Sequence, residues 1–285
     1  MLNPLAPQRK PGMTDDEARI AAILPPLGHR TPPASWRAGF TFPLRLAKVT
    51  KRLAGRLHEV EAFALGSPEM RREMLAVLAD LGIELRIYGE QHLQPGGQVL
   101  MWNQTSHLDH PALAAAIPVP FRSTFNLEVG KVPKYGAWLR AHGHYFLNRF
   151  DEAQWRASLA EAAAWVRAGG TVTVSPEGTR SWDGKLLPMK RGAFILAMQS
   201  GMPIVPIAVY GAREALPRGR AVIEPGVIEV EFRPPIATTG YTDETRKGLK
   251  AVVAAAFEQA LAEGPPSGRE TRDPSTGPGG TAGRG

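Results

Sequence analysis

The sequence contains no cysteine. This absence excludes disulfide bonds, thiolate nucleophiles and cysteine-ligated zinc sites, and it is compatible with a reducing cytosolic compartment. Long apolar runs are lacking too: a membrane-spanning helix needs about 18 or more apolar residues, and the best candidate, residues 192–209, is interrupted by Gln199, Ser200 and two prolines. The first 20 residues lack the continuous apolar core of a signal peptide. We therefore expect a cytoplasmic protein whose contact with a membrane is peripheral, at its inner face.

Acidic residues are scarce in the first part of the chain. The sequence carries a formal net charge of +7, and residues 1–60 supply most of it, with ten Lys or Arg against four Asp or Glu. Such a segment indicates an anionic partner, either a membrane surface or a nucleic acid, or a solvated basic face that binds nothing. Because the sequence has no nucleic-acid-binding motif and no interleaving of aromatic and basic residues, we expect an anionic membrane surface and no nucleic acid.

The composition divides the chain into four parts. Residues 1–36 are rich in proline and charge and are predicted to be loosely ordered, and residues 263–285, with many Gly and Pro and no apolar anchor, are predicted to be a disordered tail. Residues 37–81 are predicted to form a basic pair of helices, which lies on anionic lipid or packs against the main domain. The remaining residues, 82–262, are predicted to form an α/β domain.

The helical pair is predicted from residue spacing. Over residues 42–64, apolar residues recur mostly three and four apart, with five Lys or Arg between them. Ser67 followed by Pro68 is typical of a helix start, and Gly82 is typical of a helix end.

The α/β prediction depends on hydrophobic patterns that alternate along the chain. Short alternating or β-branched runs predict strands, and longer runs with a helical period predict helices. The predicted strands are 83–88, 98–102, 171–174, 203–210 and 227–233, and the predicted helices are 108–116, 152–168, 191–200 and 243–262. This alternation is typical of an α/β fold, and we expect a mixed central sheet flanked by helices and preceded by the basic helical pair.

Four polar, glycine-bearing segments fall at the ends of predicted strands, where α/β folds bind ligands. These segments are residues 103–111, 130–149, 175–181 and 201–206.

The third of these segments has the composition of an anion site. It reads Ser-Pro-Glu-Gly-Thr-Arg-Ser, and Gly178 lets the backbone approach a ligand closely. Thr179 offers a hydroxyl, and the planar guanidinium of Arg180 suits a phosphate. The residues alone leave an alternative open, a polar loop in which Glu177 pairs with Arg180 or Arg191.

In order and spacing, the four segments resemble the four sequence blocks of the glycerolipid acyltransferase superfamily, whose members acylate lysophosphatidic acid or glycerol 3-phosphate. The third block of that family reads Phe-Pro-Glu-Gly-Thr-Arg-Ser, which residues 175–181 match at six of seven positions. Gly143 and Arg149 match the second block, and Pro203 and Pro206 match the fourth.

The resemblance covers about residues 82–233 and implies an acyl transfer. A fatty acyl group moves from an acyl-CoA or acyl-ACP thioester, the co-substrate, to the hydroxyl of a lysophospholipid or glycerophosphate acceptor. No metal, no other cofactor and no acyl-enzyme intermediate takes part. The residues expected to bind substrate are Glu177, Gly178, Thr179, Arg180, Arg149 and Lys131.

The first block departs from the family pattern. That pattern is Asn-His, four further residues and Asp, in which the His is the general base and the Asp orients it. When Asp109 is aligned with the family's Asp, Gln104 occupies the position of the His. Gln has no titratable group, although it can hydrogen-bond a hydroxyl or an oxyanion. The candidates for a catalytic role are therefore Asp109, Gln104, His107 and His110.

Three interpretations of this departure stay open. His107 or His110 reaches the acceptor hydroxyl from another backbone position. Alternatively, Gln104 polarises the hydroxyl and turnover is slow. In the third interpretation, the chain is a catalytically impaired family member that acts as a lipid-binding or regulatory protein.

Several His and Trp residues are expected to have structural roles rather than catalytic ones. His142 and His144 are spaced like metal ligands, but no carboxylate cluster accompanies them, so no metal site is predicted. Trp102, Trp138 and Trp155 are expected in the core or along an acyl tunnel.

Overall fold

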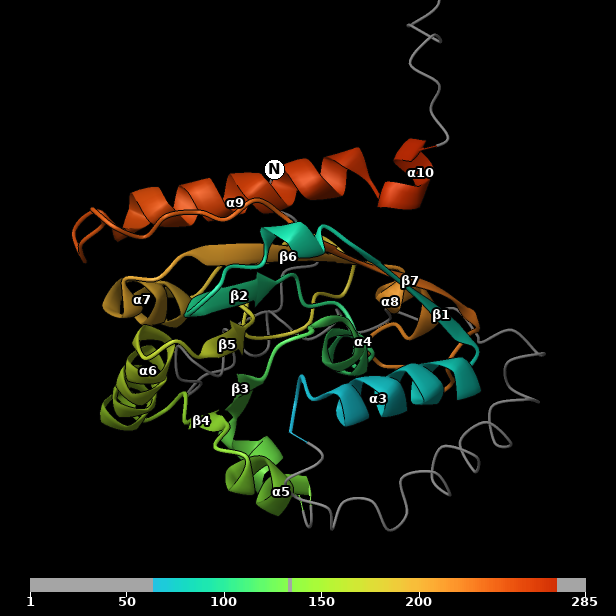
Figure 1. The fold of residues 1–285 in the computed structure, drawn as a ribbon, viewed down its shortest axis with the longest axis horizontal. Helices are drawn as coiled ribbons and strands as arrows, with labels where there is room; N and C mark the ends of the chain where they lie inside the picture. The colour runs from blue at the N-terminus through green and yellow to red at the C-terminus, as the bar shows by residue number, and fades with distance from the viewer. Residues whose placement is uncertain (1–63, 133–134, 271–285) are drawn as a thin grey trace, which may run out of the picture.

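A seven-stranded sheet lies at the centre of the residues that the computed structural model describes, 64–132 and 135–270 (Figure 1). Helices flank it on both faces. The prediction of an α/β fold with a mixed, helix-flanked sheet is confirmed. The predicted segment 1–36 and all of the first predicted helix except its last residue lie outside the described residues.

The elements alternate along the chain much as the sequence predicts. The strands are β1 (Ile83–Tyr88), β2 (Gln98–Trp102), β3 (Phe121–Asn126), β4 (Tyr145–Leu147), β5 (Thr171–Val174), β6 (Ile204–Tyr210) and β7 (Gly226–Phe232). The α-helices are α3 (Pro68–Asp80), α4 (Asp109–Ala116), α5 (Tyr135–Ala141), α6 (Glu152–Arg167), α7 (Arg191–Ser200), α8 (Ala212–Ala215), α9 (Arg246–Glu263) and α10 (Pro266–Glu270). Two 3-10 helices, η2 (Glu90–His92) and η3 (Leu127–Lys131), complete the described elements.

The strand order in the sheet is β1-β7-β6-β2-β5-β3-β4. From β6 to β4 all neighbours pair in parallel, whereas β7 is antiparallel to β6. At the far edge β1 is parallel to β7, with Ile83 opposite Gly226. The sheet therefore combines a five-stranded parallel part with a two-stranded part that runs the other way.

The sheet separates two apolar cores. The α3, α4 and α8 helices cover one face, and the α6, α7 and α9 helices cover the other (Figure 1). The central strand β2 is buried along its whole length: Leu100 and Trp102 face the first core, and Val99 and Met101 face the second. The sequence of a strand that is buried on both faces is a continuous apolar run, and residues 98–102 nearly have this pattern.

The helix predicted to begin at Ser67 is α3, and its ends have the expected caps. The hydroxyl of Ser67 accepts the N–H of Met70 at 3.1 Å, and Pro68 is the first helical residue. After α3 the chain turns at Gly82, whose φ of +82° favours glycine. Of the two alternatives for the helical pair, the structure places α3 against the main domain, because Val77 and Leu78 belong to the first core.

Two strands of the sheet, β3 and β4, are absent from the sequence prediction. In β3 the residues Arg122, Ser123 and Thr124 interrupt the apolar pattern, and β4 has only three residues. Both pair in parallel with a neighbouring strand. Tertiary pairing, rather than local propensity, accounts for them.

The prediction of a disordered tail from residue 263 is wrong for residues 263–270. The α9 helix continues to Glu263, and α10 follows at Pro266. Arg269 donates to both carboxylate oxygens of Glu231 on β7, at 2.6 and 2.9 Å, and the N–H of Ser267 donates to Glu229 at 3.1 Å. The anchor of this segment is ionic rather than apolar, so hydrophobicity gives no sign of it. Residues 271–285 lie outside the described residues.

No helix in the described part of the chain is both long enough and apolar enough to cross a bilayer.

Candidate functional site

The loops that follow β2 and β5 meet because these strands are parallel neighbours, and the candidate site lies where they meet. Asn103, directly after β2, fixes the first loop. Its side-chain amide donates to the carbonyl of Val209 at 3.1 Å, and its oxygen accepts the N–H of Val209 at 2.8 Å. The side chain thus extends the pairing between β2 and β6 by one step and sets the direction of residue 104.

Glu177, in the loop after β5, joins the two loops. Its side chain is 1% exposed. One carboxylate oxygen accepts the N–H of Gln104 at 2.7 Å and the other accepts the N–H of Leu187 at 2.6 Å. The alternative in which Glu177 pairs with Arg180 or Arg191 is wrong, because Arg191 pairs with Glu152 at 2.9 Å and neither carboxylate oxygen of Glu177 pairs with Arg180. Burial raises the pKa of Glu177 to about 7, although both hydrogen bonds oppose that shift.

Asp109 begins α4, as predicted, and it closes the first loop. The carboxylate accepts the N–H groups of Thr105 and Ser106 at 2.8 and 2.9 Å. Asp109 is 0% exposed. Burial raises its pKa to about 7, against the hydrogen bonds, and the nearby charge of Glu177 raises it further.

Gln104 precedes both acidic residues in the chain, and hydrogen bonds hold its backbone N–H and its carbonyl. Its N–H donates to Glu177, and its carbonyl accepts the N–H of Ser181 at 2.9 Å. The side chain is half-buried. Position 104 is therefore a fixed place beside the segment 175–181, and it carries an amide where the resemblance predicts an imidazole.

Arginine side chains gather around this segment. Arg149, at the end of the predicted second block, donates to the carbonyl of Gly178. Arg218 donates to the carbonyl of Arg180 at 2.7 Å, and its guanidinium lies 4.2 Å from the ring centroid of Trp182. Within the described residues, the guanidinium of Arg180 makes no hydrogen bond or ion pair. Arg180 and Arg218 make no ion pair with a carboxylate among the described residues, and convergent arginines of this kind suit an anion.

Sequence reasoning missed Arg218. It lies in the loop that follows α8, outside all four predicted segments. The Pro-Arg-Gly-Arg sequence at 217–220 does indicate a short basic turn. No feature of the local sequence, however, predicts that this turn contacts Arg180.

The two candidate histidines have different surroundings. His107 is exposed. Desolvation, followed by the charges of Arg180 and Arg218, lowers its pKa below the ordinary 6.5. The ring of His110 instead lies 5.7 Å from those of both Trp102 and Phe125, and burial lowers its pKa to about 4. His107 thus faces the arginines, whereas His110 faces an apolar pocket.

The other predicted binding residues are only partly brought together. Gly178 and Thr179 lie in the loop beside Arg180, and Gly178 has a φ of +65°. Lys131 is exposed at the end of η3 and makes no described contact with Arg180. Glu128 on the same 3-10 helix does reach Arg149 electrostatically. That these residues bind substrate stays a prediction.

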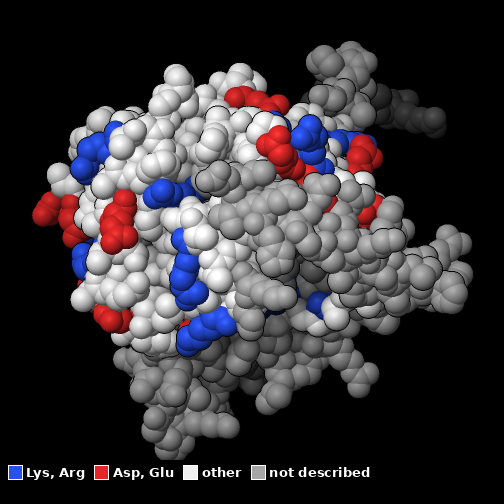
Figure 2. Space-filling model, turned by 60° about the horizontal axis from the view of Figure 1, so that its bottom comes forward, with Lys and Arg blue, Asp and Glu red and all other residues white. Residues whose placement is uncertain are grey.

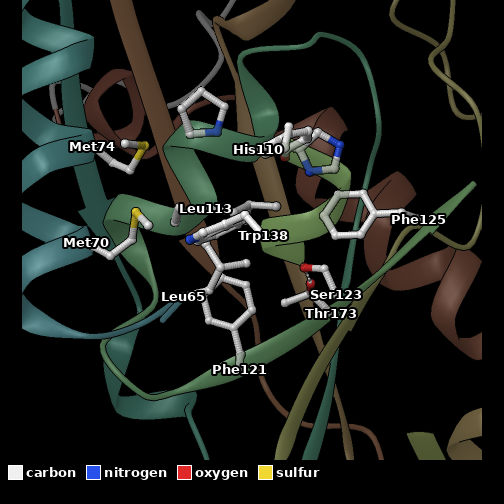
Figure 3. A pocket seen from close by; sticks show the side chains of 13 residues that line it. Leu65, Met70, Met74, His110, Leu113, Phe121, Ser123, Phe125, Trp138 and Thr173 are labelled. Carbon is white, nitrogen blue, oxygen red and sulfur yellow. Dashed lines mark hydrogen bonds between the residues drawn. The ribbon is translucent and has the colours of Figure 1, made fainter. Parts of the chain in front are cut away.

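An apolar pocket of about 260 Å³ opens beside His110, between α3, α4, β3 and α5 (Figure 3). Most of its wall is hydrocarbon or thioether. The lining residues are Leu65, Met70, Met74, His110, Pro111, Leu113, Ala114, Phe121, Ser123, Phe125, Tyr135, Trp138 and Thr173. Of the three tryptophans considered from the sequence, Trp138 lines this pocket, Trp102 packs in the first core and Trp155 packs in the second, on the other face of the sheet.

His142 and His144, the two histidines spaced like metal ligands, each contact neighbouring residues. Nδ1 of His144 accepts the N–H of Ser123 at 2.9 Å, and the ring of His142 contacts that of Trp138 in a tilted arrangement, with ring centroids 4.4 Å apart. Within the described residues, no three His, Asp, Glu or Cys side chains come together to hold a metal ion.

On one face of the molecule, Lys and Arg side chains form a column, with acidic side chains to either side (Figure 2). The described residues carry no net charge, with 21 Lys or Arg against 21 Asp or Glu, so this column is a local feature of one face.

Comparison with known proteins gives a consistent result. The family described as Acyltransferase matches residues 84–210. The 1-acyl-sn-glycerol-3-phosphate acyltransferase of Limnanthes douglasii is 32% identical over 162 residues, which are 56% of this chain and 57% of the relative. The enzyme of the same name from Saccharomyces cerevisiae is 30% identical over 167 residues, which are 58% of this chain and 55% of the relative. The chain thus spans little more than half the length of these curated relatives.

The same fold is found among solved structures. One of them is the 1-acyl-sn-glycerophosphate (LPA) acyltransferase PlsC of Thermotoga maritima, with a TM-score of 0.60 and 21% sequence identity, over 79% of this chain and 98% of that one.

Proposed function

Since this chain belongs to the glycerolipid acyltransferase superfamily, we propose that it transfers a fatty acyl group from a thioester donor to the hydroxyl of a phosphate-bearing lipid acceptor. Lysophosphatidic acid is the acceptor that the names of its relatives indicate. The donor is an acyl-CoA or acyl-ACP, and no other cofactor and no metal ion takes part.

The observation that carries this proposal is the group of arginines beside residues 175–181. The guanidinium of Arg180 makes no hydrogen bond or ion pair with a carboxylate among the described residues, although Asp109 interacts with it electrostatically. Arg218 and Arg149 are oriented by the carbonyls of Arg180 and Gly178. The planar fork of an arginine pairs with two phosphate oxygens at once. These side chains bind the phosphate of the acceptor.

The apolar pocket takes the acyl chain. His110 connects the pocket to the arginine site. It lines the pocket, and burial together with the charges of His107 and Arg180 lowers its pKa. A cavity of about 150 Å³ holds a six-carbon ring, so by proportion a pocket of this size takes about ten carbon atoms.

His107 is the base that accepts the hydroxyl proton. Asp109 and Glu177 are buried and their oxygens already accept backbone N–H groups, and His110 lies between two aromatic rings. His107, by contrast, is exposed beside Arg180 and is neutral at pH 7 because its pKa is lowered.

The reaction is a direct displacement. As the acceptor oxygen attacks the thioester carbonyl, its proton passes to His107, a carbon–oxygen bond forms and the carbon–sulfur bond breaks. The proton then passes to the departing sulfur, and the donor leaves as a free thiol.

A membrane surface supplies the acceptor. Phe150 is 69% exposed and Val132 is 47% exposed, and each adjoins a cation in the chain, Arg149 and Lys131. Exposed apolar side chains next to cations suit the surface of an anionic bilayer. The protein therefore works at the cytoplasmic, inner face of the membrane.

The test is an acyl-transfer assay with purified protein, anionic vesicles that contain lysophosphatidic acid, and radiolabelled acyl-CoA or acyl-ACP. We expect labelled phosphatidic acid, about 10²–10⁴-fold less of it per unit time with His107→Gln, and a smaller loss with His110→Gln, which changes the wall of the acyl pocket but not the base. If the wild-type protein forms no product with either donor, the proposed transfer is wrong. If His107→Gln retains full activity while transfer occurs, only the assignment of the base is wrong.

A second function, lipid binding without transfer, is favoured by one observation, which is that the fixed position beside Glu177 carries Gln104 instead of a base. Under this function the wild-type protein binds lysophosphatidic acid but transfers nothing, and Gln104→His gains transfer. Asp109 already lies five residues further on, as the family pattern requires.

A further inference from the structure

The pocket assigned to the acyl chain contains hydrogen-bond donors that have no acceptor. Donors in a hydrocarbon wall are costly unless something pairs with them, because a buried N–H or O–H gives up its bonds to water. These donors therefore indicate that the ligand of the pocket carries a hydrogen-bond acceptor.

The first such donor is the indole N–H of Trp138. Trp138 is 6% exposed and lines the pocket, and its Nε1 has no hydrogen-bond partner among residues 64–132 and 135–270. In Figure 3 the indole nitrogen lies at the end of the ring system directed toward Met70 and Leu65. Both neighbours belong to the same apolar cluster as Trp138, so neither side chain offers an oxygen.

The second donor comes from a pair of hydroxyls on the sheet. Oγ of Ser123 on β3 and Oγ1 of Thr173 on β5 hydrogen-bond each other inside the pocket (Figure 3). Two hydroxyls carry two protons, and their mutual bond uses one of them. No other hydrogen bond of either hydroxyl is present among the described residues, so one O–H is left to donate.

A single bound water does not suit this arrangement. A buried water typically makes about three hydrogen bonds, whereas the Trp138 nitrogen and the Ser123–Thr173 pair offer one donor each and the rest of the lining is mostly apolar. The volume of about 260 Å³ is also several times that of one water molecule, about 30 Å³.

We propose that the pocket selects an acyl chain that carries an oxygen substituent, a hydroxyl group in the simplest case, on the part of the chain that the pocket encloses. Trp138, or the Ser123–Thr173 pair, donates a hydrogen bond to that oxygen, while Met70, Met74 and the other apolar residues hold the methylenes. This inference rests on the proposed function only for the statement that the ligand is an acyl group.

The test measures binding separately from transfer. The probes are free decanoic acid and a set of hydroxydecanoic acids that differ in the position of the hydroxyl, titrated against the full chain by calorimetry. We expect at least one hydroxy isomer to bind about 3- to 10-fold more tightly than decanoic acid, the effect of one net hydrogen bond.

Two variants identify the donor. Either Trp138→Phe or the double variant Ser123→Ala with Thr173→Val abolishes the preference, while decanoic acid still binds. Met74→Leu, which changes the pocket wall without touching a polar group, is the matched control and keeps the preference. Binding of decanoic acid by each variant shows that the pocket is still folded.

Equal binding of decanoic acid and all hydroxy isomers overturns the inference, and so does a preference that survives in both variants. These results are independent of the acyl-transfer assay. A protein that prefers a hydroxy acid but transfers nothing contradicts the proposed function alone, and a protein that transfers but shows no preference contradicts this inference alone.

Discussion

Glu177 accepts the backbone N–H of Gln104 at 2.7 Å, so a side chain from the loop after β5 holds the backbone of the loop after β2. The reverse contact, from the N–H of Ser181 to the carbonyl of Gln104, completes the link at 2.9 Å. Because both contacts use only the backbone of residue 104, its position does not depend on which side chain it carries. The geometry of this part of the site thus survives the replacement of the expected histidine.

Glu177→Gln is expected to weaken this link. An amide has one oxygen, so one of the two N–H groups loses its acceptor and faces a donor instead, which costs about 1–3 kcal/mol of unfolding free energy. Urea denaturation measures this loss, and acyl transfer is expected to fall with it. Glu161→Gln, on the exposed face of α6, is the control. If both variants are equally stable, Glu177 does not brace the loop.

The stability of the fold is expected to depend on pH through Asp109. Its pKa is about 7 in the folded protein and about 3.8 in the unfolded chain, so the folded state holds the proton more tightly. Its contribution to the unfolding free energy is therefore complete below about pH 4 and is lost as the pH rises toward and through 7. Asp109→Asn removes this dependence.

The measurement for Asp109 is the difference between wild type and variant in urea denaturation from pH 4 to 8. A difference is needed because His110, whose folded pKa is lowered to about 4, contributes with the opposite sign between about pH 4 and 6.5. A difference that stays constant with pH contradicts the assignment.

Removal of either unpaired arginine is expected to affect phosphate-bearing acceptors selectively. In Arg180→Ala or Arg218→Ala the KM for lysophosphatidic acid rises about 10- to 100-fold, the range of a charge-assisted hydrogen bond. The rate with a monoacylglycerol, which has no phosphate, stays nearly unchanged. Arg156→Ala, whose partner is Glu152 on the surface of α6, alters neither value. An equal loss with both acceptors argues against a phosphate site.

Gly178→Ala is expected to destabilise the loop through its backbone alone. A Cβ at this position meets no atom closer than 3.6 Å, so space is available, but a φ of +65° costs a residue with a Cβ about 1–2 kcal/mol. Gly248→Ala, at an exposed position of α9 without positive φ, is expected to stabilise by about 0.5–1 kcal/mol. Thermal or urea denaturation of the two variants compares them directly.

Ala114→Leu is expected to shorten the preferred acyl chain. Ala114 lines the pocket, and Leu adds three carbon atoms there, so the preferred donor shortens by roughly two to three carbons if the wall does not give way. A series of donors of different length measures the shift. Ala164→Leu, on the exposed side of α6, leaves the preference unchanged, and an unchanged preference in Ala114→Leu places the acyl chain elsewhere.

Most of the sheet could be predicted because its central strands have strong local patterns. Residues 98–102 and 204–210 are nearly continuous apolar runs, and the parallel strands that they form are buried on both faces. β3 could not be predicted from hydrophobicity, because the inward position between Phe121 and Phe125 carries the polar Ser123. Pairing with β4 and β5 stabilises the strand.

The site was predictable where function has a local motif and unpredictable where it depends on packing. Residues 175–181 identified the anion loop. Arg218 was missed because it reaches Arg180 from 38 residues away. The two histidines, only three residues apart, could not be told apart from the sequence, because the orientation of each ring depends on neighbours such as Trp102 and Phe125 that come from other strands.

The pairing of β1 with β7 has a consequence for biosynthesis. Ile83 leaves the ribosome long before its partner Gly226, and β1 has no other neighbour in the sheet. Until almost the whole domain has been translated, a nascent chain therefore carries an unpaired strand beside half-built cores. An unpaired strand edge can pair with other chains and aggregate. We therefore expect chains truncated by stop codons before β7 to form aggregates rather than shorter folded proteins.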